Sequence, residues 1–446
     1  MGRASRRRAL DVWANGIRVG RWAIPSTGSM AFTYDASWVA SKEGRPLSLS
    51  LPITLDRLTV TGERVASYFD NLLPDSEPIR RRIQSRYSLP GREPFDLLAA
   101  IGRDCVGAVQ LMPVDEEPQD VYAIRTTALR EDRIEQLLRT VPRAGSPLDD
   151  EDDLRISLAG AQEKTALTRH RGRWCLPHSS TPTTHIFKLP LGLVGNRELD
   201  LSTSVENEWL CSRILAAFGL PVAECQMARF GDAKALVVTR FDRKLHDSGK
   251  YLLRLPQEDF CQATGTPSAS KYEADGGPSL LNIAKILQAS DRRDADLATL
   301  LHAQLLFWML AATDGHAKNF SLSLLAGGRY QLTPLYDVIS AWPIAGPKQN
   351  QIHEKKLKLA MALYGKSKHY RVADIRRDHF NSTAHRCGLG PDMEAIVAAT
   401  IENTTAVIDR VEAELPPRFP ARVFETVTNG LKRSARALSL MPSKLA

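Results

Sequence analysis

The stretch Thr313-Asp-Gly-His-Ala-Lys-Asn-Phe320 is the most informative part of this sequence. It places Asp314 and Asn319 five positions apart, directly after an apolar segment with helical spacing and directly before a predicted hairpin. A third oxygen-bearing residue, Asp337, follows that hairpin in Leu335-Tyr-Asp-Val338. Phosphoryl transfer requires a carboxylate near the acceptor hydroxyl and oxygen ligands that hold magnesium against the β- and γ-phosphates. These three residues supply such a set.

The spacing of these residues is that of a protein-kinase catalytic loop, which has Asp-x4-Asn and a metal-binding Asp after a short strand pair. Each residue alone has an ordinary structural explanation, since Asp and Asn are common in turns. Their order, spacing and context together favour catalysis and predict a catalytic group of Asp314, His316 and Asn319. His316 could orient Asp314 or the transferred phosphate, or it could be a hydrogen-bonded loop histidine. Lys318 receives no role from the sequence.

A kinase also needs an upstream lysine that grips the phosphates, and Lys188 at the end of the alternating strand Thr-His-Ile-Phe-Lys fits that need. Lys188 lies between a glycine-containing segment, Ser157-Leu-Ala-Gly-Ala-Gln-Glu-Lys164, and a predicted helix that carries Glu206 and Glu208. This is the order of a kinase small lobe, and we expect Glu208 to pair with Lys188. Gly160 alone is a weak phosphate-loop signal, because many tight turns contain one glycine.

The chain of 446 residues is longer than one ordinary domain, because a single core stops growing near ~250 to 300 residues. Its 43% hydrophobic and 25% charged content is typical of globular proteins. A formal charge of +8 is compatible with a nucleotide or nucleic-acid ligand, although general solubility is the simpler explanation. Six cysteines without a CxxC pair argue against a zinc cluster or a disulfide framework and indicate a reducing cytoplasm. The most apolar helical stretch, 297–312, falls short of the ~20 residues that span a bilayer, so we expect no membrane segment.

Strand and helix patterns divide the sequence into three units. Residues 1–150 combine short strands, such as 11–21, with helices and end in acid- and proline-rich sequence, which predicts a small α+β domain. Residues 151–250 are rich in strands and predict a small lobe. Residues 251–446 are mostly helical and predict a large lobe, in which one hairpin over 320–333 is the expected exception. The predicted fold class is α+β, with a two-lobed protein-kinase-like fold after the N-terminal domain.

The chain resembles the HipA family of serine/threonine kinase toxins over nearly its whole length. The similarity is carried by long motifs in a fixed order, namely Arg45-Pro-Leu-Ser-Leu-Ser-Leu-Pro52, Phe69-Asp-Asn-Leu-Leu-Pro-Asp-Ser76, Ile101-Gly-Arg-Asp104, Ile156-Ser-Leu-Ala-Gly-Ala-Gln-Glu-Lys-Thr165, Leu255-Pro-Gln-Glu-Asp259, Lys271-Tyr-Glu-Ala-Asp-Gly-Gly-Pro278 and Asp314-Gly-His-Ala-Lys-Asn-Phe320. Motifs of this length and order are highly specific. The family has a small N-terminal domain packed on a two-lobed kinase, which agrees with the organisation predicted above.

The resemblance implies ATP and Mg²⁺ as cofactors and gives roles to residues of this chain. Asp314 would be the catalytic base, Asn319 and Asp337 the magnesium ligands, Lys188 the phosphate lysine and Ser157 an autophosphorylation site. With Lys188, Glu208 and Asp337, the predicted nucleotide contacts are those of the phosphate loop and the hinge at 238–241: Ala159, Gly160, Ala161, Gln162, Thr239, Arg240 and Phe241. The family commonly has Glu at the position of Thr239, and backbone hydrogen bonds to adenine could serve here instead.

The implied function is that of a toxin that transfers the γ-phosphate of ATP to a protein, with an aminoacyl-tRNA synthetase as the expected substrate, and so causes growth arrest or persistence. The implied partners are a helix-turn-helix antitoxin and, through it, DNA; the antitoxin and autophosphorylation would each inactivate the toxin. Two alternatives stay open. The Asp-x-His-x-x-Asn pattern also resembles the loops of phosphoinositide kinases, and a DNA-bound corepressor without kinase activity would share the fold. The long motifs outside the loop count against the first, and the complete catalytic set counts against the second.

Overall fold

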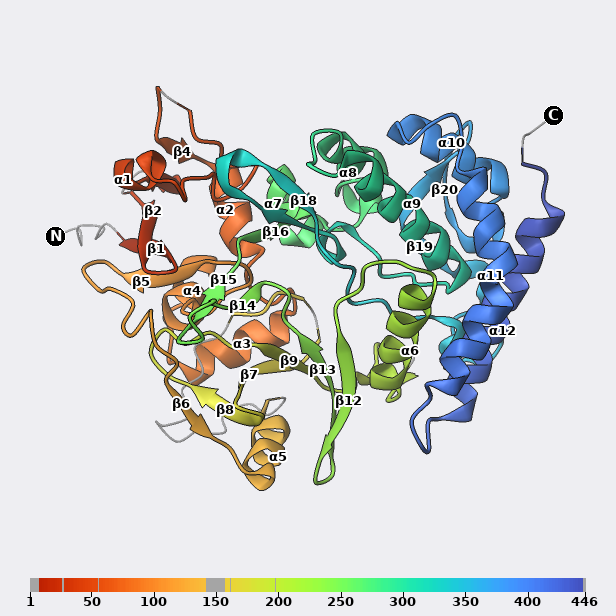
Figure 1. The fold of residues 1–446 in the computed structure, drawn as a ribbon, viewed down its shortest axis with the longest axis horizontal. Coiled ribbons are helices and arrows are strands. Elements are labelled where there is room, and N and C mark those ends of the chain that lie inside the picture. Colours follow the sequence, from red (N-terminus) through yellow and green to blue (C-terminus); the bar gives the residue numbers. More distant parts are fainter. Residues whose placement is uncertain are drawn as a thin grey trace.

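The computed structural model describes residues 8–25, 28–54, 56–141, 157–160, 162–196 and 198–443. Figure 1 shows a mixed region of sheet and helices at the N-terminal end, a twisted sheet below it and a large helical region that ends at the C-terminus. Separate hydrophobic cores fill these three regions. The α+β class predicted from the sequence is therefore confirmed, and a strand-rich region precedes the helix-rich one.

The N-terminal domain is an antiparallel five-stranded sheet with helices packed against it. The strand order is β4-β3-β2-β1-β5, with β1 (Arg8–Ala14), β2 (Ile17–Ile24), β3 (Ala31–Tyr34), β4 (Thr59–Thr61) and β5 (Gln110–Pro113). Its helices are α1 (Ala36–Ala40), α2 (Glu63–Asp70), α3 (Glu77–Arg86) and α4 (Pro94–Ile101). Trp22 of β2 stacks on Phe69 of α2 with ring centroids 3.9 Å apart, so the sheet and its helices share one core.

The strand character predicted over 11–21 belongs to two strands. Asn15 and Gly16 adopt φ values of 48° and 83° and turn the chain back, so that β1 and β2 pair antiparallel. Asn-Gly is the residue pair that most readily forms such a two-residue turn, because both positions need a left-handed backbone. The turn signal was thus present inside the alternating run.

The small lobe is built on a six-stranded sheet of order β12-β13-β9-β7-β8-β6. Its strands are β6 (Thr126–Ala128), β7 (Lys164–His170), β8 (Arg173–Pro177), β9 (His185–Lys188), β12 (Cys225–Phe230) and β13 (Ala233–Thr239), and its helices are α5 (Glu131–Thr140) and α6 (Ser204–Ala217). Two hairpins lie outside this sheet, β10 (Gly192–Val194) with β11 (Leu199–Leu201) and β14 (Arg243–Leu245) with β15 (Leu252–Arg254).

The division predicted at residue 150 lies outside the described residues. The elements β6 and α5 precede it in the chain, yet β6 pairs with β8 and α5 contributes Ile134 and Leu138 to the small-lobe core. The division into 1–150, 151–250 and 251–446 stays a proposal. For its first boundary we propose a position near β5 instead, because β6 and α5 pack with the small lobe.

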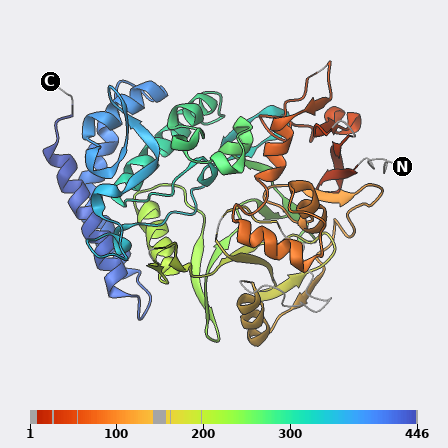
Figure 2. The same cartoon turned by 180° about the vertical axis from the view of Figure 1, so that it is seen from behind.

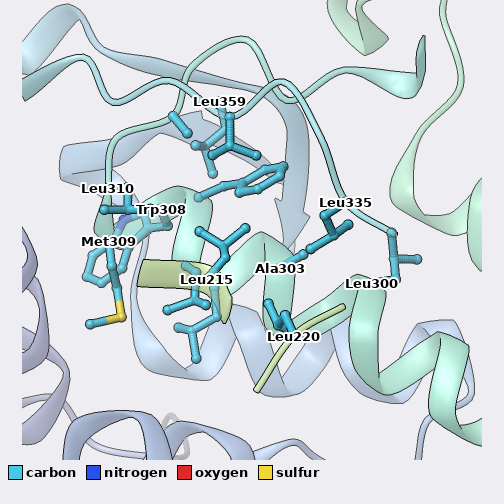
Figure 3. Packing of buried hydrophobic residues seen from close by; sticks show 14 of the residues in the cluster. Leu215, Leu220, Leu300, Ala303, Trp308, Met309, Leu310, Leu335 and Leu359 are labelled. Carbon is cyan, nitrogen blue, oxygen red and sulfur yellow. The ribbon is translucent and has the colours of Figure 1, made fainter. Parts of the chain in front are cut away.

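The large lobe is mainly helical. It contains α7 (Phe260–Thr264), α8 (Leu280–Leu287), α9 (Arg293–Met309), α10 (Arg377–Cys387), α11 (Glu394–Ala413) and α12 (Ala421–Leu440), and a small sheet of β16 (Gln257–Asp259), β17 (Ser321–Leu324) and β18 (Tyr330–Leu332). Helix α9 is buried along most of its length. Figure 3 shows Leu300, Ala303 and Trp308 of this helix in one cluster with Leu215 of α6 and with Leu359 of β19 (Lys358–Tyr364). Helices α11 and α12 lie at the end farthest from the N-terminus (Figures 1 and 2).

The predicted hairpin over 320–333 is present as β17 and β18, but a second hairpin joins β19 (Lys358–Tyr364) to β20 (Lys368–Arg371). The expectation of one hairpin in this lobe was therefore wrong. The β19 residues form a continuous buried run without alternation, which does not distinguish a strand from a buried helix. Across the ranges that the structure describes, no helix has both the length and the apolar character needed to cross a membrane.

A buried ion cluster joins the N-terminal domain to the small lobe. The Asp104 carboxylate lies 2.9 Å from Arg243 Nη2, 3.4 Å from Arg240 Nη1 and 3.3 Å from Arg254 Nη2. Asp242 supplies a second carboxylate, 2.8 Å from Arg240 Nη2. Burial raises the pKa of Asp104, but the three arginines lower it further, so the net pKa lies well below the ordinary value. The cluster fixes the N-terminal domain directly behind the predicted hinge.

Candidate active site

A cleft lies where the small lobe, the large lobe and the N-terminal domain meet. It brings together nearly all of the predicted site residues, namely Ala159, Gly160, Gln162, Lys188, Glu208, Thr239, Arg240, Phe241, Asp314, His316, Asn319 and Asp337. Ala161 lies outside the described residues, and Ser157 is not part of the cleft lining. The N-terminal domain contributes Asn71 and Asp75 to the wall, which the sequence did not predict.

The loop that follows α9 is folded so that Asp314 and Asn319 meet. The side-chain amide of Asn319 donates to the backbone carbonyl of Asp314 over 2.8 Å, which closes the segment on itself. Gly315 packs against Phe307 of α9, where a Cβ would come within 2.4 Å of the ring. Asn319 is buried, whereas the Asp314 side chain is 60% exposed. The Asp314 carboxylate is therefore the group of this loop that an external hydroxyl can reach.

Lys188 is the charged centre of the cleft. Its Nζ lies 2.5 Å from Glu208 Oε1 and 2.6 Å from Asp337 Oδ1. The ion pair of Lys188 with Glu208 that the sequence order predicts is thus formed. Burial lowers the pKa of Lys188, but Asp337 and Glu208 raise it, and the net pKa lies above the ordinary value. Burial likewise raises the pKa of Asp337, but Lys188 and Lys164 lower it further, which keeps this carboxyl ionised.

Asp337 and Asn319 have the chemistry of magnesium ligands. Asp337 adopts φ 62°, which is uncommon for a non-glycine residue, and the Asn319 amide approaches its carbonyl at 3.5 Å. Mg²⁺ is usually held by one or two protein oxygens and completes its shell with phosphate oxygens and water. Among the described residues no cluster of three or more His, Cys, Asp or Glu could hold a metal. The oxygens of the Asp337 and Asn319 side chains fit a magnesium ion whose shell nucleotide phosphates and water would complete.

The phosphate end of the cleft contains a lysine that we did not predict. Gly160 has φ 107°, and a Cβ there would meet Lys164 Nζ at 2.6 Å. Lys164 begins β7 and pairs in register with Lys188 of β9, so two lysines border the same space. Burial and the neighbouring Lys188 lower the pKa of Lys164 to about 8. The sequence signal that could have indicated Lys164 was its position. It is the last residue of the glycine-containing segment, just as Lys188 is the last residue of its strand.

Ser157 lies behind the phosphate loop. Its side chain is fully buried, and its hydroxyl donates to the carbonyl of Leu72 in the N-terminal domain over 2.7 Å. The Ser157 N–H donates to the Asp104 carbonyl over 3.1 Å. A hydroxyl enclosed in this way cannot accept a phosphate until the segment moves. Autophosphorylation of Ser157 stays a prediction.

The predicted hinge follows the end of β13. Thr239, Arg240 and Phe241 border the cleft, and the Phe241 ring lies 5.8 Å from that of Tyr336, which gives this end an apolar wall. The Arg240 side chain is 1% exposed and its guanidinium binds Asp242 and Asp104. The charge of the Arg240 guanidinium is therefore already neutralised by two carboxylates. A contact between a nucleotide and the Arg240 backbone stays a prediction.

Tyr272 connects the segment after α7 to the catalytic loop. Its hydroxyl donates to Asp314 Oδ1, and its ring meets His316 edge-on with centroids 5.1 Å apart. His316 Nε2 lies 3.8 Å from the same oxygen, and within the described residues its buried Nδ1 has no hydrogen-bond partner. Burial lowers the pKa of His316, although Asp314 raises it. A role of His316 in orienting Asp314 or the transferred phosphate stays a prediction. No role was predicted for Tyr272, although it lies in one of the long motifs.

Two family models match the chain, the HipA N-terminal domain over residues 10–112 and the HipA-like C-terminal domain over residues 156–408. The chain belongs to the HipA family. One relative, the Y4mE protein of Sinorhizobium fredii, is 32% identical over 411 residues, which cover 91% of this chain and 92% of that protein. The serine/threonine-protein kinase toxin HipA of Shewanella oneidensis is 28% identical over 345 residues, which cover 74% of this chain and 75% of that protein.

A solved structure shows the same HipA fold. A chain of the Shewanella oneidensis complex of HipA, HipB and operator DNA matches with a TM-score of 0.77 at 22% identity, and the match covers 96% of this chain and 97% of that chain. The predicted fold, two kinase-like lobes with an N-terminal domain, is confirmed by this match.

Proposed function

We propose that this HipA-family chain is a serine/threonine-protein kinase toxin that uses ATP and Mg²⁺. The observation that carries the proposal is the meeting of Lys188, Asp337 and Asn319 in one cleft, beside the exposed carboxylate of Asp314. These groups supply a cation for the phosphates, an ionised metal ligand and a base for an acceptor hydroxyl, which is the set that phosphoryl transfer requires.

The proposed mechanism divides the residues between nucleotide and acceptor. Lys188 would neutralise phosphate charge, and Asp337 and Asn319 would hold the metal. Bound magnesium supplies charge neutralisation at the β- and γ-phosphates. Asp314 would accept the proton of the acceptor hydroxyl. At the same time the hydroxyl oxygen would bond to the γ-phosphorus, and the bond between that phosphorus and the ADP oxygen would break. Tyr272 holds Oδ1 of Asp314, which leaves Oδ2 for the acceptor.

The test is incubation of the pure protein and its Asp314→Asn variant with γ-labelled ATP, Mg²⁺ and a bacterial lysate. A protein band labelled only by the wild type supports the proposal. A labelled lipid or metabolite would instead indicate a small-molecule kinase. No label at all, with DNA binding in the presence of an antitoxin, would indicate a corepressor. Mass spectrometry of the labelled band tests the expectation that the substrate is an aminoacyl-tRNA synthetase.

The proposal includes a helix-turn-helix antitoxin as partner and DNA contact through that antitoxin. Its support is family membership and the fold shared with a protein solved together with HipB and operator DNA. We expect expression of the chain alone to arrest bacterial growth, and Asp314→Asn to remove the arrest. Equal arrest by both forms would show that toxicity does not depend on catalysis.

The proposal also includes inactivation by autophosphorylation at Ser157. The Ser157 hydroxyl is enclosed against the Leu72 carbonyl, where a phosphate with about −1.5 to −2 charge has no room. Once modified, the segment could not return, and Gly160 would lose its place over the nucleotide. Mass spectrometry after incubation with Mg-ATP checks the modification. Phosphorylated protein that binds ATP normally would contradict the switch.

A further inference from the structure

Asp75 of the N-terminal domain touches both ends of the cleft. Its Oδ1 lies 2.7 Å from Lys318 Nζ and its Oδ2 lies 2.9 Å from Lys271 Nζ. Its backbone N–H donates to the Gly160 carbonyl over 3.0 Å. Figures 1 and 2 show why this is possible, because α2 of the N-terminal domain lies beside α7 of the large lobe. One residue thus binds the phosphate loop and two segments of the large lobe.

One lysine directly precedes a residue of the predicted catalytic group, and the other directly precedes a residue that hydrogen-bonds to that group. Lys318 is followed by Asn319, and Lys271 is followed by Tyr272, whose hydroxyl donates to Asp314. A displacement of either ammonium group therefore moves a backbone segment that carries a functional side chain. The Asp75 carboxylate is the point where these two segments are held together.

The contacts of Asp75 are enclosed and charged. The side chains of Lys318, Asp75 and Lys271 are 3%, 10% and 14% exposed. Burial raises the pKa of Asp75, but Lys318 and Lys271 lower it further, to about 2. Without this carboxylate, two largely buried ammonium groups would lack their shared counter-charge, which is costly in a low-dielectric environment. The two segments would then separate.

We infer that Asp75 is a positioning residue of the active site, through which the N-terminal domain sets the catalytic loop and the Tyr272 segment relative to the phosphate loop. The inference rests on the proposed kinase function for its effect on rate. It does not rest on that function for its effect on structure, because the contacts themselves are independent of any reaction.

The first experiment compares Asp75→Asn with wild type. We expect kcat to fall roughly 10- to 100-fold, because small displacements of reacting groups cost rate steeply. The KM for MgATP should change less than kcat, because the Asp75 side chain binds neither Lys188 nor Asp337 and its contact with Gly160 is made by the backbone and is kept. A role in folding alone would lower the amount of folded protein without this split between kcat and KM. An unchanged kcat in folded Asp75→Asn would overturn the inference.

Asp70→Asn is the matched control. It makes the same charge change in the same domain, but Asp70 binds Arg80 and Ser268 and none of the groups that Asp75 holds. Its kcat should stay within about twofold of wild type, as for groups outside the reacting site. A loss as large as that of Asp75→Asn would show that any charge removed from this face has the same effect, and would overturn the inference.

Hydrogen exchange supplies a readout that needs no activity. Peptides that contain Lys318 and Lys271 should exchange faster in Asp75→Asn than in wild type or Asp70→Asn. If wild type transfers no phosphate, the proposed function fails while this readout still decides the inference. If Asp75→Asn does not fold, Asp75→Glu replaces it, since it keeps the charge and shifts the carboxylate by one methylene. Wild-type exchange and wild-type kcat in folded Asp75→Glu would overturn the inference.

Discussion

The side chains of Asp337 and Asp314 have different partners, although both belong to the residues that we propose for phosphoryl transfer. Asp337 is 2.6 Å from Lys188 at the nucleotide end of the cleft, whereas Asp314 is bonded to Tyr272 on the acceptor side. We expect Asp337, at the nucleotide end, to govern nucleotide binding and Asp314, on the acceptor side, to govern phosphoryl transfer. Substituting each residue in turn should separate the effect on binding from the effect on transfer.

We expect Asp337→Asn to weaken MgATP binding and to abolish transfer, because it removes the ionised carboxylate that we propose as a metal ligand. Asp314→Asn should bind MgATP normally and lose transfer by on the order of 10²- to 10⁴-fold, because it removes only the proposed base. Calorimetric titration with a non-hydrolysable MgATP analogue measures binding, and single-turnover labelling measures transfer. Equal losses of nucleotide affinity in the two variants would contradict this division.

Glu258 is a buried acid at the contact between the N-terminal domain and the large lobe. Its carboxylate accepts a hydrogen bond from the Ser48 hydroxyl. It also accepts one from the Leu49 N–H, with a distance of 2.9 Å between nitrogen and oxygen. Burial raises its pKa from 4.5 to about 8. The folded protein therefore keeps a proton that the unfolded chain releases between these two values. The contribution of this proton to the free energy of unfolding is fully present below pH 4.5 and is lost as the pH rises to about 8.

We expect Glu258→Gln to remove this pH dependence, because an amide stays neutral throughout. Relative to wild type, the variant should gain stability as the pH rises, by on the order of a few kcal/mol near the upper end of the range. Urea unfolding at a series of pH values measures the difference. The exposed Glu43→Gln should follow wild type. Parallel pH profiles for wild type and Glu258→Gln would refute the assignment.

The phosphate loop depends on the backbone of one residue. Gly160→Ala should weaken MgATP binding for two reasons. A backbone φ of 107° disfavours an L side chain, and the new Cβ would lie only 2.6 Å from Lys164 Nζ and would push this ammonium group away. The loss of unfolding free energy should be about 1 to 3 kcal/mol. Gly172→Ala is the control, since φ there is 76° with open space around the Cβ. It should cost stability but leave the Kd for MgATP unchanged, and equal Kd changes would contradict the role of the loop.

Elements with a local signal could be predicted from the sequence, and those decided by tertiary packing could not. The hairpin of β17 and β18 was predictable because the turn Ala326–Gly328 separates two short apolar runs. The strand β19 was not, because Leu, Ala and Met favour helices and its five central residues are all buried. Its pairing with β20 and burial beneath α10 override that propensity.

At the scale of the whole molecule, the domains are joined through Asp104. We expect Asp104→Asn to lower the free energy of unfolding by about 3 to 5 kcal/mol, because it leaves buried arginines without their shared carboxylate. Urea unfolding followed by circular dichroism measures this. The partly exposed pair of Arg18 and Asp35 offers the control Asp35→Asn, because Asn can keep the N-cap that Asp35 forms at α1 and only the ion pair is lost, which should cost less than about 1 kcal/mol. Similar losses in the two variants would show that the cluster does not stabilise the fold.

The candidate site likewise contains some features that local sequence predicts and others that depend on tertiary packing. The residues of the predicted catalytic loop were proposed from a short, fixed spacing, as in Asp314 and Asn319. Lys188 and Asp337 are 149 positions apart, and their common place in the cleft was expected only from the order of kinase segments and the family resemblance. Asp75 and Lys318 are 243 positions apart, and Tyr272 and Asp314 are 42 apart. No spacing rule connects such pairs, so their contacts became visible only once three regions of the chain had packed together.

The ion cluster around Asp104 also has a consequence for biosynthesis. The ribosome adds Asp104 136 residues before Arg240 and 150 residues before Arg254. At ~5 to 20 residues per second, the carboxylate waits roughly 7 to 30 s for its partners. During that interval the emerging N-terminal domain presents to solvent a surface that the finished protein buries. Messages that break or stall in this window would yield fragments with an exposed docking face, accessible to chaperones and proteases and without any nucleotide site.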